Sequence, residues 1–173
     1  PDSILVGCEH TYWGDIAGTV VELFAERGVQ LVIYAGKLGS LNSTDIPNTC
    51  LASSAESVLP NGNSVVWENI FEPTKFNDGL CHYGIHVTVP SVLQETIQWL
   101  KSLDPRIRFV DPELGHMAVA AKLAGIGFSN LHIISDNLAA QHEHDLSNER
   151  ASEVVEKRSI LLTQMTDAIR ASI

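Results

Sequence analysis

The sequence lacks any long apolar run. No stretch of its 173 residues approaches the ~20 consecutive apolar residues that a membrane-spanning helix needs. Basic residues are also scarce, since 11 Lys and Arg face 21 Asp and Glu and leave a formal net charge of −10. Binding to a nucleic-acid backbone comes mainly from Lys and Arg that neutralise phosphates. The sequence therefore argues against a membrane or a nucleic acid as partner and favours a small molecule or another protein.

Cysteine is rare as well. Cys8, Cys50 and Cys81 are odd in number and share no metal-ligand spacing, which favours free thiols in a reducing, cytoplasmic compartment. The sequence begins without an initiator Met or a signal peptide, and we expect it to be a piece of a longer protein. With 45% hydrophobic and 18% charged residues, it has the composition of one ordinary globular domain over residues 1–173.

Strand-like apolar segments alternate with helical patterns along the chain. This alternation predicts a three-layer α/β/α fold around a central mixed sheet. The predicted strands are residues 3–7, 30–35, 65–68, 84–89, 108–110 and 131–134, and the predicted helices are residues 16–27, 90–103, 113–123 and a terminal helix from about Ser147 through Ile173.

Three carboxylates follow two of these strands. Asp111 and Glu113 come directly after the strand at 108–110, and Asp136 follows the strand at 131–134. Because the carboxyl ends of strands line the ligand crevice of an α/β sheet, we expect these groups to meet at one site. The alternative is that each acidic side chain only caps the helix that follows it.

A glycine-containing segment follows the strand at 30–35. Gly36-Lys37-Leu38-Gly39-Ser40 is interpreted as a loop whose backbone N–H groups can approach an anion or a sugar closely. A simple tight turn remains the alternative. Further on, His142, Glu143, His144 and Asp145 fit no common zinc spacing, and we interpret them as a solvated loop and predict no metal site.

Three segments together resemble the superfamily of purine nucleoside phosphorylases and uridine phosphorylases, which includes the methylthioadenosine/S-adenosylhomocysteine nucleosidases. GVQLVIYAGKLGSL (28–41) is similar to that family's strand and glycine loop, VDPELGHMAVAAKLAGI (110–126) to its V-E-M-E-A segment and helix, and HIISDN (132–137) to its strand ending in Ser-Asp. The resemblance covers nearly all of the chain and implies a nucleoside phosphorylase-like domain.

The resemblance implies a role for each candidate residue. Asp136 would assist departure of a purine base, with Arg150 beside it, and Glu113 would bind the sugar hydroxyls. The same resemblance places further residues in the substrate site, namely Asp111, Pro112, Gly36, Lys37, Gly39 and Ser135. It also implies a nucleoside as small-molecule partner, a homo-oligomer, and no cofactor other than phosphate as a possible co-substrate.

The sequence departs from the family at several positions. Tyr34 stands where phosphorylases have a phosphate-binding Arg, and Lys37 stands where they have Ser. Since Arg offers a bidentate fork that neither replacement provides, hydrolysis is favoured over phosphorolysis. Pro112 replaces a Met before the sugar-binding Glu, and Leu114-Gly115 replaces a pair of small residues. The family's first strand, which carries the water-activating Glu of nucleosidases, is expected to lie before Pro1.

The sequence allows two other functions. The first is a non-catalytic nucleoside-binding or interaction domain of the same fold, which the departures at Tyr34 and Lys37 favour. The second is a dinucleotide-binding domain, but Gly7 and Gly14 do not form the G-x-G-x-x-G fingerprint. A neighbouring subunit often completes the pocket in the family, and His10 is a candidate for that role, with a surface His as the alternative.

Overall fold

An eight-stranded mixed sheet forms the middle of the molecule. The computed structural model describes residues 3–8, 14–76, 79–143, 148 and 150–173. The strand order across the sheet is β4-β3-β6-β7-β1-β8-β2-β5. The strands are β1 (Leu31–Ser40), β2 (Leu51–Ser53), β3 (Glu56–Val58), β4 (Ser64–Val66), β5 (Cys81–Tyr83), β6 (Ile85–Thr88), β7 (Ile107–Asp111) and β8 (Gly127–Asn137).

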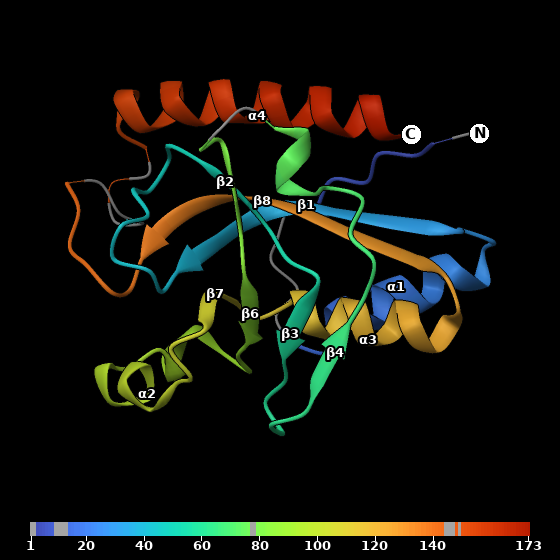
Figure 1. Ribbon diagram of the computed structural model, residues 1–173. Helices are drawn as coiled ribbons and strands as arrows, with labels where there is room; N and C mark the ends of the chain where they lie inside the picture. The colour runs from blue at the N-terminus through green and yellow to red at the C-terminus, as the bar shows by residue number, and fades with distance from the viewer. Residues whose placement is uncertain (1–2, 9–13, 77–78, 144–147, 149) are drawn as a thin grey trace.

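Helices cover both faces of this sheet. The helix α4 (Ser152–Ser172) lies along one face, and α1 (Ile16–Glu26) and α3 (Leu114–Ala124) lie side by side against the other (Figure 1). Each interface has its own apolar core. One core joins Val21 and Leu114 to Phe128, and the other joins Leu131 to Leu161 and Met165. The predicted three-layer α/β/α fold is therefore confirmed.

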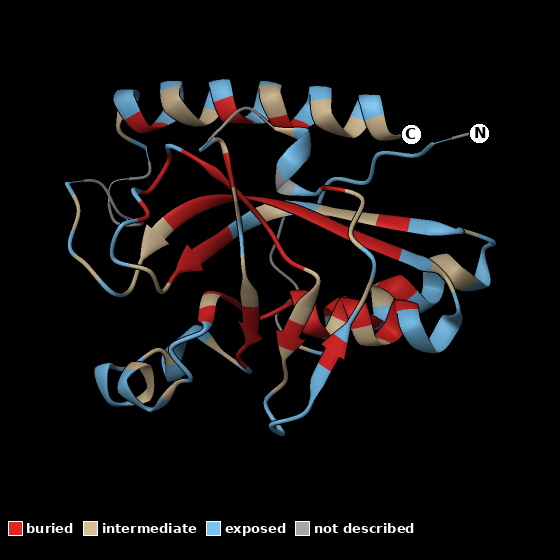
Figure 2. Ribbon diagram, viewed as in Figure 1, coloured by how far each residue is buried: buried red, intermediate tan, exposed pale blue. Residues whose placement is uncertain are grey.

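The two longest strands, β1 and β8, pair in parallel at the centre. Their register runs from Leu31 opposite Gly127 to Ser40 opposite Asn137, with one irregularity at Leu38/Gly39. Most of β8 is buried (Figure 2), as expected of a strand covered on both faces. This pairing brings the ends of β1 and β8 together, and β7 ends next to them because it pairs with Gly39 and Ser40.

Several predicted boundaries were wrong. Gly36, Lys37 and Gly39 do not form a loop, because β1 continues through Ser40 and its backbone pairs with β8 to the end. The segment at 3–8 has no regular secondary structure. The polar stretch after Leu41, where no strand was predicted before residue 65, contributes β2, β3 and the start of β4.

The helix predicted over 90–103 is also wrong in its extent. It is two short helices, a 3-10 turn at Val92–Gln94 and α2 (Ile97–Ser102). The side chain of Thr96 accepts a hydrogen bond from Trp99 N and caps α2, which starts a new helix at this point. The terminal helix is confirmed, with its first helical residue at Ser152, while Ser147 lies outside the described residues. Within the described ranges, none of the helices combines the length and the apolar character that crossing a membrane requires.

Candidate active site

Asp111 ends β7 and caps α3. Its Oδ1 accepts hydrogen bonds from the backbone N–H of Glu113 at 2.9 Å and of Leu114 at 2.8 Å. Asp111 therefore caps the first turn of α3 with one of its two carboxylate oxygens. Glu113 occupies the N-cap position but makes no side-chain capping bond. Glu113 is nevertheless a buried residue, with an exposed fraction of 6%.

Two histidines that the sequence reasoning missed lie on either side of Asp111. His86 on β6 brings its Nε2 to 3.2 Å from Asp111 Oδ1, and His132 on β8 brings its Nε2 to 3.9 Å from Asp111 Oδ2. Both imidazoles are fully buried. Burial alone would raise the pKa of Asp111, but the two imidazoles and the backbone N–H of Leu114 outweigh it and lower that pKa. Asp111 is therefore ionised at neutral pH.

The neighbours of Asp111 are shifted toward their neutral forms. Burial, reinforced by the negative charge of Asp111, raises the pKa of Glu113 to about 8. Burial lowers the pKa of His132 to about 4. Two carboxyl groups in one site with pKa values pushed apart are typical of acid–base centres. At neutral pH the site thus holds one carboxylate, one carboxylic acid and a neutral imidazole.

Asp136 lies at the end of β8, opposite Gly39 of β1. The Ser135 hydroxyl donates to Asp136 Oδ1 at 2.7 Å, and its oxygen lies 3.2 Å from Leu38 O. A Cβ at Gly39 would meet Asp136 Oδ2 at 3.1 Å and Leu138 Cδ1 at 2.9 Å. A side chain at Gly39 would therefore crowd Leu138 and Asp136, which is a different reason for glycine from the loop that was predicted.

Replacing Gly39 with Ala should lower the free energy of unfolding by about 1–3 kcal/mol, because the added methyl group overpacks this contact. The gain of ~0.4–1 kcal/mol that Gly→Ala usually gives through the unfolded state does not offset this cost. Urea unfolding measures the difference. Gly7→Ala is the matched control, since nothing lies within 4 Å of a Cβ at Gly7. Equal stability of the two variants would contradict the close approach.

Burial, with the negative charges of both Asp136 and Asp111, raises the pKa of Glu95 to about 7. Glu95 lies between the 3-10 turn at Val92–Gln94 and α2, within the range predicted from the sequence to be one helix. Gly39 of β1 pairs with Val110 of β7 and with Asp136 of β8, so the acidic ends of β7 and β8 lie on either side of the same residue.

The remaining predicted residues lie around this site or outside it. Pro112 is buried between Asp111 and Glu113, and a Cβ at Gly36 would meet the His132 ring at 3.2 Å. Lys37 and Arg150 are exposed. His10, His144 and Asp145 lie outside the described residues. Within the described ranges, no three His, Cys, Asp or Glu side chains are arranged to hold a metal ion.

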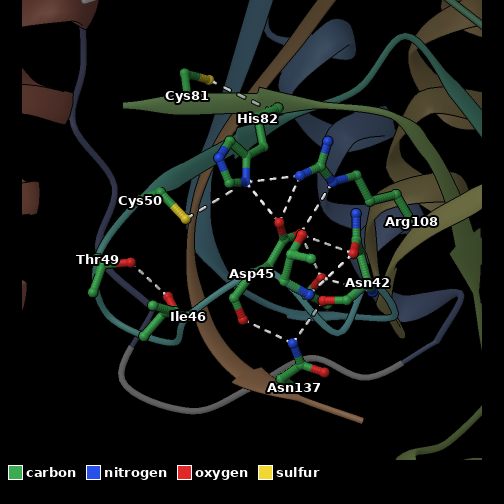
Figure 3. Close-up of polar contacts among 11 residues, drawn as sticks. Asn42, Asp45, Ile46, Thr49, Cys50, Cys81, His82, Arg108 and Asn137 are labelled. Carbon is green, nitrogen blue, oxygen red and sulfur yellow. Dashed lines mark hydrogen bonds and ion pairs between the residues drawn. The ribbon is translucent and has the colours of Figure 1, made fainter. Parts of the chain in front are cut away.

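A second polar cluster holds the connection from β1 to β2 (Figure 3). Asp45, fully buried, accepts two hydrogen bonds from Arg108, Nη2 to Oδ1 at 2.6 Å and Nε to Oδ2 at 3.0 Å. His82 Nδ1 lies 2.9 Å from Asp45 Oδ1, and the Ser40 hydroxyl donates to Oδ2 at 2.7 Å. The bond to Asp45 raises the pKa of His82 to about 9. Asp45 thus ties residues 41–50 to β5 and β7 through charged partners.

Comparison with known proteins shows one curated relative at low identity. No family model matches the chain. The chain is 26% identical over 123 residues to the oxidoreductase cns1 of Cordyceps militaris, a match that takes in 67% of this chain and 16% of that protein. The chain therefore spans about a sixth of the curated relative's length.

Solved structures identify the fold. The methylthioadenosine/S-adenosylhomocysteine nucleosidase of Neisseria meningitidis matches with a TM-score of 0.72 and 16% identity, over 93% of this chain and 78% of that one. The corresponding enzyme of Streptococcus pneumoniae matches with a TM-score of 0.69 and 17% identity, over 93% of this chain and 78% of that one. Futalosine hydrolase of Helicobacter pylori matches with a TM-score of 0.63 and 14% identity, over 90% of this chain and 76% of that one. The chain therefore has the α/β fold of the nucleoside phosphorylases and nucleosidases.

Proposed function

We propose that this protein cleaves the N-glycosidic bond of a purine-type nucleoside, and that water is the acceptor in preference to phosphate. The fold is shared with nucleosidases that act on such bonds. The observation that carries the proposal is the pairing of Gly39 with Val110 of β7 and with Asp136 of β8, which brings the strand ends that bear Asp111 and Asp136 to one place. An acidic centre of this kind suits a reaction in which positive charge develops on a sugar.

Cleavage of an N-glycosidic bond requires different roles of Asp136 and Glu113. Breaking an N-glycosidic bond builds negative charge on the departing base and positive charge on the sugar. Asp136, whose Oδ1 accepts from the Ser135 hydroxyl, assists the base in its protonated form, in which it can donate a proton or a hydrogen bond. Glu113 binds the sugar hydroxyls, and in its protonated form it offers both a donor and an acceptor to a diol.

The environment of Tyr34 supports water over phosphate. Burial raises the pKa of Tyr34, so its phenol stays neutral, and its ring packs edge-on against His132 with centroids 4.6 Å apart. A neutral phenol offers phosphate neither the charge nor the paired donors of an Arg. Lys37 is the cation of β1 in this region, and its exposed side chain is the group that phosphate would use if phosphorolysis occurred.

Two further expectations belong to this proposal. Arg150 would assist Asp136 once substrate is bound, and the protein would act as a homo-oligomer. Both come from the family resemblance. Arg150 is exposed and lies just before α4.

Release of free base tests the proposal. The substrates are purine nucleosides, methylthioadenosine and S-adenosylhomocysteine, each assayed with and without inorganic phosphate. We expect release without phosphate and no faster release with it. Release that requires phosphate would replace hydrolysis with phosphorolysis and make Lys37 the anion ligand. Binding of nucleosides without release of base from any of them would establish the non-catalytic alternative.

A further inference from the structure

The strand β8 is irregular just before Asp136. The pairing of β1 with β8 shifts by one residue at Leu38/Gly39, and Ser135 is the extra residue on β8. An extra residue of this kind bends a strand and turns the side chains beside it in a new direction. Two pairs of residues then follow before both strands end. Pairing with β1 therefore constrains the direction of Asp136 weakly, although Asp136 is partly exposed and needs a defined direction to act on a ligand.

The side chain of Asn137 makes four hydrogen bonds at this point. Its Nδ2 donates to Asn42 O at 2.8 Å and to Asp45 O at 2.7 Å. Its Oδ1 accepts from the backbone N–H of Ala139 at 2.8 Å and of Ala140 at 3.1 Å. These bonds use both donor hydrogens and both lone pairs of the amide and so fix its orientation. Asn137 therefore joins the connection from β1 to β2 to the chain that follows β8.

The part of this connection that Asn137 contacts is itself held in place. Asp45 is fully buried, and its carboxylate accepts two hydrogen bonds from Arg108 of β7 (Figure 3). Because removal of one partner of a buried ion pair leaves an uncompensated charge, this pair keeps Asp45 at β7. The bond from Asn137 Nδ2 to the Asp45 carbonyl then fixes the end of β8 relative to β7.

We propose that Asn137 is a positioning residue for base departure, which fixes the chain on one side of Asp136 and thereby directs the Asp136 carboxyl toward the departing base. The inference rests on the proposed function and adds to it a residue that acts through Asp136. On the other side of Asp136, the Ser135 hydroxyl donates to Oδ1 at 2.7 Å. Both neighbours in the sequence thus orient this carboxyl, Ser135 by a direct bond and Asn137 through the backbone.

Asn137→Ala tests the inference with two substrates. The variant loses the four hydrogen bonds but keeps Asp136 and Ser135. Release of a purine base, which needs a proton donor, should fall by about 10–100-fold, the cost of a small misplacement of a catalytic group. Cleavage of p-nitrophenyl riboside, whose leaving group departs without a proton, should change little. Both rates come from one sample, so their ratio does not depend on the fraction of folded protein.

A double-mutant cycle gives a second readout. In the Asp136→Asn background the proton donor is absent, so Asn137→Ala should lower nucleoside cleavage no further. A purely structural defect would lower it by the same factor in both backgrounds. Asn61→Ala is the matched control, because Asn61 is exposed and its Oδ1 accepts a local bond from Asn63 N at 3.0 Å. This variant should leave both rates unchanged.

The outcomes separate this inference from the proposed function. Unchanged nucleoside cleavage in Asn137→Ala, an equal loss for both substrates, or additive losses in the cycle overturns the role of Asn137 and leaves the nucleosidase proposal standing. A wild-type protein that releases no base from any nucleoside overturns both.

If Asn137→Ala does not fold, the crystal structure of the wild-type protein with bound adenine decides. Asn137 bonded to the carbonyls of Asn42 and Asp45, with the Asp136 carboxyl within hydrogen-bond distance of the adenine, supports the inference. An Asp136 carboxyl that points away from the adenine, or an Asn137 side chain that has left those carbonyls, overturns it.

Discussion

Replacing Asp136 with Asn is expected to lower kcat for base release by about 10²–10⁴-fold and to change KM little. Asn has the shape of Asp but cannot donate a carboxylic proton to the departing base. Ser135 can still donate its hydroxyl to the Asn side-chain oxygen, as it now does to Asp136 Oδ1 at 2.7 Å. The group lost therefore matters in the transition state more than in substrate binding.

A chromogenic substrate sharpens this test. p-Nitrophenyl riboside carries a leaving group that departs without protonation, so Asp136→Asn should cleave it nearly as fast as the wild-type protein does. Rates are measured for this substrate and for the best natural nucleoside, with Asp167→Asn as the exposed control. Wild-type turnover of the nucleoside by Asp136→Asn would remove Asp136 from the mechanism.

Replacing Glu113 with Gln is expected to stabilise the protein at alkaline pH by roughly 2–4 kcal/mol relative to pH 5. The pKa of Glu113 rises from 4.5, its ordinary value, to about 8 in the folded protein. Between these values the folded state binds more protons than the unfolded state. The contribution of Glu113 to stability is therefore complete below pH 4.5 and is lost as the pH rises through about 8. Gln has no proton to lose and removes this dependence.

Urea unfolding at pH 5, 7 and 9 measures the effect. The wild-type protein should lose stability between pH 5 and pH 9, and Glu113→Gln should lose less. Glu26→Gln is the matched control, because Glu26 is exposed on α1. Parallel pH profiles for Glu113→Gln and the wild-type protein would show that the Glu113 carboxyl is not held neutral by its surroundings.

The layered fold and the strand ends that bear the acidic residues could be predicted because they depend on apolar runs and small residues that are contiguous in the sequence. Apolar runs predicted β1, β7 and β8, and the small residues between Glu113 and Ala124 predicted α3. Apolar runs that end just before Asp111 and Asp136 predicted that the ends of these two strands lie together, and both pair with Gly39. What failed was the interpretation of Gly36 and Gly39, because glycine is also used inside a strand where another group approaches the backbone closely.

The partners of these carboxylates could not be predicted from spacing. His86, Glu95 and His132 are single polar residues in three separate segments, and only the tertiary fold brings them to Asp111 or Asp136. The sequence did contain one indication that the two histidines are part of a site. A His within GIHVTV or LHII interrupts an apolar strand, and a polar residue at a buried position is more informative than an apolar one. The same holds for Asp45, which is isolated in sequence and receives its partners from β5 and β7.

The central pairing of β1 with β8 has a consequence for how the chain folds. Leu31 and Gly127, which start the two strands, are partners although most of the sheet lies between them in the sequence. Contacts of such long range form late, since the entropy of closing the loop must be overcome before pairing offsets it. During synthesis β1 emerges well before β8, so its apolar side chains stay exposed to solvent until β8 has been synthesised. Slow refolding and a requirement for chaperones during expression are therefore expected of this protein.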